Sequence, residues 1–203
     1  MTTLPPGLLR PAACRSPAPE LAPALIGVEL HCQGVAGIIT ETEAYQGEED
    51  RACHASRGRT PRASGLYTAP GTLYIYRCYG IHWLLNIVCD LLDRPAAVLI
   101  RGLRLNQGVA LARRRRGQPR QPLDQLTNGP GKVAQALGLD AAAHGSRLGQ
   151  SDCPVVLRVP RALSVPCACG PRVGIDGAGE PWVSRPWRWW LAGFPVVRPV
   201  RTN

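Results

Sequence analysis

Acidic, aromatic and imidazole side chains are concentrated in one short part of this sequence. Glu43 lies close after the apolar pair Ile38-Ile39, and Tyr45 and His54 follow it. A buried strand is normally filled with Val and Ile, and Glu is almost never buried without a partner or a function. Aromatic rings beside a lone carboxylate suit a flat, weakly polar ligand. The pattern indicates an active site, and a nucleobase lifted out of its stack is the ligand that fits it.

Glu43 is the residue expected to perform the chemistry. A carboxylate beside an extruded base can take a proton from water, and a neighbouring guanidinium can keep that carboxylate ionised and orient the water. Arg101, which follows the apolar run 96–100, is the expected partner. A purely structural ion pair between the two is the alternative. Glu41 is expected on the opposite face of the strand and is the second choice for the base.

Short apolar runs predict the elements that position these residues. Strands are expected at residues 28–32 and 37–42, joined by a glycine-containing turn. Because side chains alternate along an extended chain, Glu43 and Tyr45 are expected on one face. Residues 47–71 are rich in Pro, Gly and polar side chains and are predicted to form a long loop, and loops of this length are usually either functional or disordered.

The aromatic segment 73–89 predicts a β-hairpin with Tyr79 at its tip. The run 96–100 predicts a strand that ends at Arg101, and further strands are expected at 155–159 and 172–175.

Residues 106–116 predict a helix that ends in four consecutive arginines, where positive charge complements the helix dipole. A mobile basic loop is expected at 117–126. A second helix is expected to begin at the glycine-rich segment 128–132 and to stop at Gly138. Backbone N–H groups at such a helix start can hold a phosphate, helped by Lys132.

Chain length and net charge further limit the domain organisation and the class of partner. At 203 residues the chain is expected to form one domain at 20–203, preceded by a flexible lead-in at 1–19. The net charge is +10, and a single lysine, Lys132, stands among 24 basic residues. Arginine matches phosphate oxygens, and an excess of positive charge is the expected footprint of a polyanionic partner.

Cysteine usage and hydropathy exclude several classes of protein. The eight cysteines are scattered, which fits reduced thiols in a cytoplasmic protein. Cys167 and Cys169 form a C-x-C pair without a second pair or a histidine at zinc spacing, so no metal is expected. No run is long and apolar enough to predict a signal peptide or a membrane span.

Several motifs together carry a family resemblance across residues 21–188. They are Glu41-Thr42-Glu43-Ala44-Tyr45, Cys53-His54, Gly58-Arg59-Thr60-Pro61-Arg62, Pro70-Gly71-Thr72-Leu73-Tyr74-Ile75-Tyr76, Tyr79-Gly80, Val98-Leu99-Ile100-Arg101, Asn128-Gly129-Pro130-Gly131-Lys132 and Pro171-Arg172-Val173-Gly174-Ile175. In this order they resemble the alkyladenine (3-methyladenine) DNA glycosylase family in its eukaryotic type.

The resemblance implies a monomeric, monofunctional base-excision repair enzyme without a cofactor or an obligate protein partner. Such an enzyme acts on double-stranded DNA, removes alkylated or deaminated purines such as 3-methyladenine and hypoxanthine, and leaves an abasic site. The implied fold is α+β, one mixed domain around a curved, mainly antiparallel β-sheet with a protruding β-hairpin.

The resemblance also implies roles for the residues of the pocket. Glu43 matches the general base of the family, and Arg101 matches its partner around the attacking water. Tyr45 and His54 match the residues that enclose the extruded base, and Tyr76 matches the third wall. His54 is also expected to offer a backbone hydrogen bond to the purine edge.

Further residues are expected to contact the DNA or to select the base. Tyr79 matches the wedge that fills the space left by the extruded nucleotide. Asn86 matches a residue that disfavours guanine by crowding its amino group. Arg59, Arg62 and Lys132 are expected to contact the DNA backbone.

The sequence departs from the family pattern at two places near this region. Residues 63–67 read Ala-Ser-Gly-Leu-Tyr where Asn and a Met-Phe pair are expected, and His82-Trp83 after the wedge is atypical. Two alternatives stay open: a non-catalytic, basic nucleic-acid-binding module, and an N-glycosidase that acts on RNA with the same carboxylate.

Overall fold

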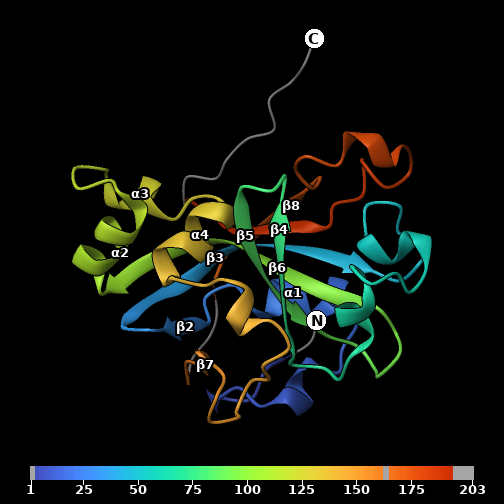
Figure 1. Ribbon diagram of the computed structural model, residues 1–203, viewed down its shortest axis with the longest axis horizontal. Coiled ribbons are helices and arrows are strands. Elements are labelled where there is room, and N and C mark those ends of the chain that lie inside the picture. Colours follow the sequence, from blue (N-terminus) through green and yellow to red (C-terminus); the bar gives the residue numbers. More distant parts are fainter. Residues whose placement is uncertain (1–2, 162–164, 194–203) are drawn as a thin grey trace.

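A computed structural model describes residues 3–161 and 165–193 of the chain. Its strands form one curved antiparallel sheet in the order β1-β7-β2-β3-β6-β5-β4, with β9 paired to β3 and β8 paired to β9 (Figure 1). The predicted α+β fold around a mainly antiparallel sheet is confirmed.

The strands of the described residues are β1 (Gly7–Leu8), β2 (Glu29–Cys32), β3 (Val35–Gln46), β4 (Leu73–Cys78), β5 (His82–Val88), β6 (Ala96–Gln107), β7 (Val155–Val159), β8 (Cys167–Gly170) and β9 (Arg188–Leu191). The α-helices are α1 (Ala18–Ala24), α2 (Val109–Arg116), α3 (Leu123–Leu126) and α4 (Pro130–Leu137). Short 3₁₀ turns are η1 (Pro11–Cys14), η2 (His54–Arg57), η3 (Ser64–Tyr67), η4 (Ala141–Ala143) and η5 (Asp176–Ala178). The predicted loop 47–71 contains η2 and η3.

The long strands β3 and β6 form the centre of the sheet. The first part of β3 pairs with β2, its later part pairs with β9, and β6 runs along its other edge. The ladder between β3 and β6 is irregular between Ile39 and Thr42. A strand end at Arg101 is not observed, because β6 continues to Gln107. Arg101 has buried carboxylate partners, so its charge does not force the chain out of the sheet.

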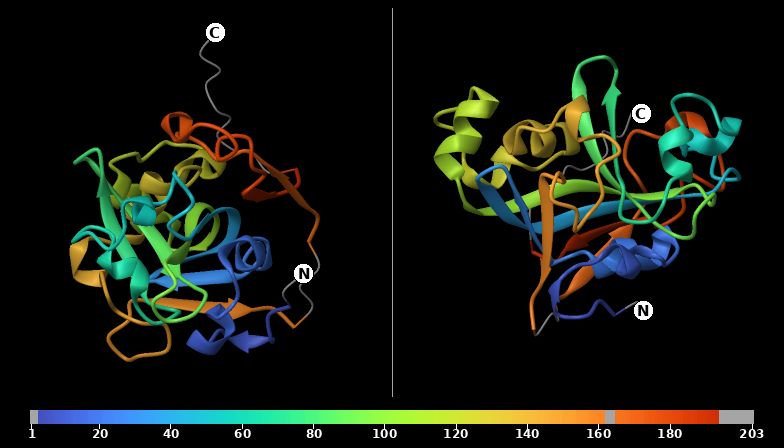
Figure 2. Two further views of the ribbon diagram at one scale, coloured as in Figure 1. Left: turned by 90° about the vertical axis from the view of Figure 1, so that its right-hand side faces the viewer. Right: turned by 60° about the horizontal axis from the view of Figure 1, so that its bottom comes forward.

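The hairpin of β4 and β5 stands out from the sheet and carries Tyr79 and Gly80 at its tip (Figure 2). Helix α4 packs against β5. A Cβ atom on Gly131 would lie 2.8 Å from Cγ of His82, so glycine is required for this close approach. The predicted hairpin at 73–89 and the predicted stop of α4 at Gly138 are both confirmed.

Helices cover both sides of the central strands. Helix α1 lies on one side, whereas α2, α4 and the hairpin lie on the other (Figure 2, right). The helix expected at 106–116 begins only at Val109, because β6 takes up the first residues. Part of the expected mobile loop 117–126 forms the short helix α3.

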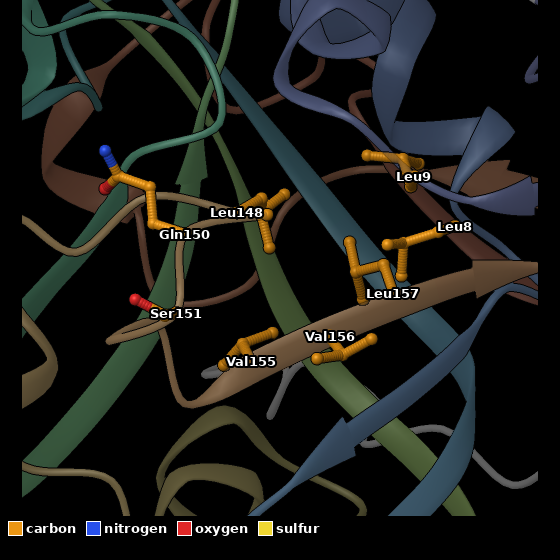
Figure 3. Close-up of a pocket in the computed structure, with 9 residues that line it drawn as sticks. Leu8, Leu9, Leu148, Gln150, Ser151, Val155, Val156 and Leu157 are labelled. Atoms are coloured by element: carbon orange, nitrogen blue, oxygen red, sulfur yellow. The ribbon is translucent and has the colours of Figure 1, made fainter.

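The described part of the lead-in is packed, in contrast to the flexible segment that the sequence predicts. Strand β1 pairs with β7, and Leu9 and Cys14 are each 1% exposed. Apolar side chains between the prolines explain this, because they cover the edge of the sheet. A hollow of about 280 Å³ lies here, lined by residues of β1 and β7 and by the loop around Leu148, and none of its lining side chains is titratable (Figure 3).

The C-terminal part differs from the expectation at one segment. Residues 172–175 do not form a strand, and Gly174 has a φ of +73°. Strands β8 and β9 close this edge of the sheet instead. Trp187 and Trp189 pack against the hydrophobic core. Helices of the described residues are all too short or too polar to cross a membrane.

Candidate active site

Glu43 lies at the centre of the sheet with its side chain fully buried. Its Oε1 accepts a hydrogen bond from the backbone N–H of Val173 at 2.7 Å. Its Oε2 accepts from the Tyr45 hydroxyl at 2.8 Å and from Nη1 of Arg101 at 3.3 Å. Burial raises the pKa of the Glu43 carboxyl above its ordinary value, against the opposing effect of these donors. The predicted pairing of Glu43 with Arg101 and the shared face of Glu43 and Tyr45 are confirmed.

Glu41 does not lie on the opposite face, and that expectation is wrong. Its Oε1 accepts hydrogen bonds from Nε of Arg101 at 3.0 Å and from Nη1 of Arg188 at 3.1 Å. Residues two apart share a face of a strand, so Glu41 and Glu43 both reach Arg101. Glu41 stands opposite Gly102, where a Cβ atom would lie 3.1 Å from the Cβ of Glu41.

His54, Tyr74 and Tyr76 form an aromatic group that lines the same small hollow as Tyr45. The rings of His54 and Tyr76 meet edge to face with centroids 4.5 Å apart. Nδ1 of His54 lies 2.8 Å from the hydroxyl of Tyr74, and that hydroxyl donates to the carbonyl of Arg62 at 2.9 Å. A hydroxyl has one proton, so Nδ1 carries the imidazole proton and Nε2 is left as an acceptor. Burial, with the nearby charge of Arg62, lowers the pKa of His54 to about 4, so the ring is neutral near pH 7.

A cavity of about 520 Å³ lies beside Glu43, which is not itself part of the lining. Its walls include Tyr45, His54 and Tyr76, and the hairpin tip lies at its rim. All three groups that donate to Glu43 also belong to residues of this lining. A smaller hollow of about 20 Å³ shares the three aromatic walls and reaches Asn86, whose Nδ2 donates to the carbonyl of Tyr74 at 3.1 Å. The predicted pocket residues are therefore brought together.

Tyr79 is the most exposed large apolar side chain of the described residues, at 88%. It occupies a tight turn in which the N–H of Ile81 donates to the carbonyl of Cys78 at 3.0 Å. The φ angles of Tyr79 and Gly80 are +50° and +68°. A positive φ at a bulky residue is an outlier that surrounding structure must enforce, and such outliers cluster at functional sites.

The three residues expected on the DNA backbone have different surroundings. Arg62 lines the cavity, with its guanidinium carbon 5.3 Å from the centroid of the Tyr76 ring. Arg59 forms an exposed ion pair with Asp93 at 3.2 Å. Nζ of Lys132 donates to Oδ1 of Asn128 at 2.7 Å, which ties the start of α4 to the preceding loop. Only Arg62 of these three lies at the cavity.

Two buried residues support the site although the sequence gives them no role. Arg172 donates to Asp50 through both terminal nitrogens, at 2.6 and 2.8 Å, and to the carbonyl of Ala44 at 2.9 Å. This arrangement fixes the segment whose next residue, Val173, donates to Glu43. Arg172 stands in one of the family motifs, but its partner Asp50 lies 122 positions away and no sequence signal joins the two.

Comparison with known proteins decides the family. The family model described as methylpurine-DNA glycosylase (MPG) matches residues 12–195. The chain belongs to this family. It is a DNA glycosylase, and the predicted resemblance is confirmed.

Bacterial relatives agree with this assignment. A protein of Rhodopseudomonas palustris (strain BisB18) is 44% identical over 178 residues, which cover 88% of this chain and 84% of the relative. A protein of Mycolicibacterium paratuberculosis is 40% identical over 189 residues, covering 91% of this chain and 89% of the relative. Both carry the name "Putative 3-methyladenine DNA glycosylase". Within residues 3–161 and 165–193 of this glycosylase, no group of three or more His, Cys, Asp or Glu side chains could hold a metal ion.

Proposed function

We propose that this glycosylase extrudes alkylated or deaminated purines from duplex DNA and hydrolyses the N-glycosidic bond with a water activated by Glu43. The observation that carries the proposal is the hydrogen bonding of Glu43. An ionised carboxylate offers about four lone-pair positions. Val173, Tyr45 and Arg101 occupy three of them, which leaves one on Oε1 for a water molecule.

The reaction balances with Glu43 as the single general base. The water oxygen attacks C1′ of the extruded nucleotide, its proton passes to Glu43, and the electrons of the glycosidic bond leave with the purine. A cationic alkylated purine departs as a neutral molecule and needs no acid, whereas neutral hypoxanthine departs as an anion that takes up a proton from solvent. Arg101 orients the water and keeps Glu43 ionised against the effect of its burial.

The aromatic walls are proposed to hold the base. Tyr45, His54 and Tyr76 line the cavity from different elements, and Nε2 of His54 is an acceptor. Asn86 lines the smaller hollow, where it is proposed to crowd the amino group of guanine. Hypoxanthine and 3-methyladenine are the proposed substrates, and the enzyme is proposed to act as a cytoplasmic monomer.

Tyr79 is proposed to open the helix. Its ring projects from the hairpin beside the mouth of the cavity, where it can fill the gap left by an extruded nucleotide. Unstacking a base costs a few kcal/mol, and less at a damaged or mismatched pair. Arg59, Arg62 and Lys132 are proposed to contact backbone phosphates.

Release of free base from matched duplexes tests the proposal. Oligonucleotides of one sequence carry hypoxanthine in a DNA strand or in an RNA strand, and the released purine is quantified under single-turnover conditions. We expect release from DNA alone. Release from RNA alone would favour the RNA N-glycosidase, and tight binding without release from either would favour a non-catalytic binding module.

A further inference from the structure

The guanidinium of Arg172 lies behind one wall of the base pocket. Its central carbon is 4.8 Å from the centroid of the Tyr45 ring and 5.2 Å from that of the Trp187 ring. Arg172 is 3% exposed and is not part of the cavity lining, whereas Tyr45 is. The positive charge therefore covers the face of Tyr45 that is turned away from the cavity.

An uncompensated charge in this position would affect the ligand on the other face. A purine stacked on Tyr45 would lie about 9 Å from the guanidinium, given the usual separation of stacked rings. Repulsion between two unit charges at that distance, with an effective dielectric constant of about 20, corresponds to a loss of at least about tenfold in binding. Both cations would also draw on the same ring quadrupole.

Asp50 supplies the compensating charge. Its two oxygens accept from both terminal nitrogens of Arg172, and both side chains are fully buried. Asp50 stays in place because it also accepts from the backbone N–H groups of Gln46 and Ala52, at 3.2 and 3.1 Å. This two-pronged geometry is the strongest form of a charge-assisted hydrogen bond.

Elsewhere around the pocket, charged side chains are also absent, paired with an opposite charge or exposed to solvent. The side chains that line the smaller hollow of about 20 Å³, which include Tyr45, His54 and Asn86, carry no full charge. His54 is the one that could become charged, and it is neutral near pH 7. Next to the pocket, Glu41 and Glu43 balance Arg101 and Arg188. Arg62 and Arg77, which also line the larger cavity, are exposed, so solvent screens their charges.

We propose that Asp50 is a specificity residue that acts through Arg172 and Tyr45: it neutralises the cation behind the ring and so allows the pocket to accept positively charged purines. This inference rests on the proposed function. It predicts that the charge of the Asp50 and Arg172 pair sets the preference between a cationic and a neutral base.

The experiment compares 7-methylguanine, which is cationic, with hypoxanthine, which is neutral, in one duplex sequence. The readout is the enzyme concentration that gives half of the maximal single-turnover rate. Binding is the step to measure, because a cationic purine loses its charge as the bond breaks. Asp50→Asn leaves one extra positive charge, and Arg172→Gln leaves one extra negative charge.

We expect Asp50→Asn to weaken binding of 7-methylguanine about tenfold relative to hypoxanthine, and Arg172→Gln to shift this ratio the opposite way. The double variant, which is neutral again, should restore the wild-type ratio. A purely structural pair would weaken both substrates equally in both single variants, and that outcome would overturn the inference. If Asp50→Asn fails to fold, Arg172→Lys, which keeps the charge, must retain the ratio that Arg172→Gln changes. Failure of the wild type to release either base would instead overturn the proposed function.

Discussion

Glu43 and Glu41 differ in one respect that an experiment can use. Both are buried and both pair with Arg101. All three donors to Glu43 belong to residues that line the cavity, whereas Glu41 also accepts from Arg188, which does not line it. Glu43→Gln is expected to lower base release by about 10²–10⁴-fold, the usual effect of losing a positioned general base. Single-turnover excision of hypoxanthine measures this.

Glu41→Gln is the matched control, since it removes a carboxylate from the same guanidinium. We expect it to retain far more activity than Glu43→Gln, with DNA affinity unchanged in both variants. Equal losses in the two variants would show that the buried charge network, and not proton transfer, accounts for the effect.

The pKa of Glu43 predicts the pH dependence of the reaction. Burial raises this pKa above the ordinary value of 4.5. Only the ionised form can accept a proton, so the rate should be full at high pH and should fall as the pH drops through the raised pKa. Single-turnover rates from about pH 8 downward test this, with circular dichroism as the control for folding. A rate that stays constant down to pH 4.5 would contradict it.

The sequence predicts which side chains are unusual for their surroundings, but not every pair of side chains that contact each other. Glu43, Tyr45, His54 and Arg101 could be predicted because their side chains are costly in an apolar strand or loop. The pairing of Asp50 with Arg172 could not, because it joins distant segments through the fold. The expectation for Glu41 is wrong, although strand alternation alone puts this residue on the same face as Glu43.

The β4–β5 hairpin holds Tyr79 in a conformation that suits another residue better. A turn with positive φ at both central positions favours Asn-Gly, and the left-handed region costs most residues about 1–2 kcal/mol. Tyr79→Asn is therefore expected to raise stability by up to about 1 kcal/mol. Chemical denaturation measures this gain.

The same substitution should weaken the extruded state by about the value of one base–aromatic stack, 1–3 kcal/mol. The loss should be larger for a lesion in a stable pair than for one in a mismatch, where less unstacking is needed. A fluorescent base analogue reports extrusion directly. Ile81→Asn, which removes a 68% exposed apolar side chain from the same tip, is the control. If it impairs extrusion as much as Tyr79→Asn, the wedge is not specific to Tyr79.

Elements whose hydrogen bonds are made within the sheet could be predicted from the sequence. The hairpin and the strands before Glu43 show alternating or β-branched patterns. Segment 172–175 carries a similar apolar pattern but is not a strand, because the N–H of Val173 donates to a side chain and Gly174 turns the backbone. The extension of β6 beyond Arg101 could not be predicted, because a buried ion pair leaves no mark on local composition.

The net charge of +10 predicts salt-dependent binding to undamaged DNA for the whole molecule. The logarithm of affinity should fall linearly with the logarithm of salt concentration, with a slope of about −0.9 for each phosphate contacted. Fluorescence anisotropy measures it. An affinity that does not change between low and physiological salt would exclude backbone contacts as the main source of binding.

Two neighbouring arginines of α2, Arg114 and Arg115, have different surroundings and are expected to have different roles. Arg115 donates to the carbonyls of Ala136 and Leu137 at the end of α4 and to that of Gln33, whereas Arg114 is exposed. Arg115→Ala should destabilise the fold by about 1–3 kcal/mol and leave the salt slope unchanged. Arg114→Ala should leave stability unchanged and reduce the slope by about 0.9 if that side chain contacts a phosphate. The reverse pattern would contradict this division.

Strand β3, which carries both Glu43 and Tyr45, has hydrogen-bonded neighbours on both edges, whereas β4 lies at the end of the sheet. Local opening begins where backbone hydrogen bonds are exposed and contacts are few. Amide hydrogens near the hairpin tip should therefore exchange with solvent long before those of β3. As the molecule is warmed, the hairpin with the proposed wedge Tyr79 should therefore open before β3, which carries the proposed general base Glu43. A partly opened enzyme is then expected to bind DNA without exposing a base.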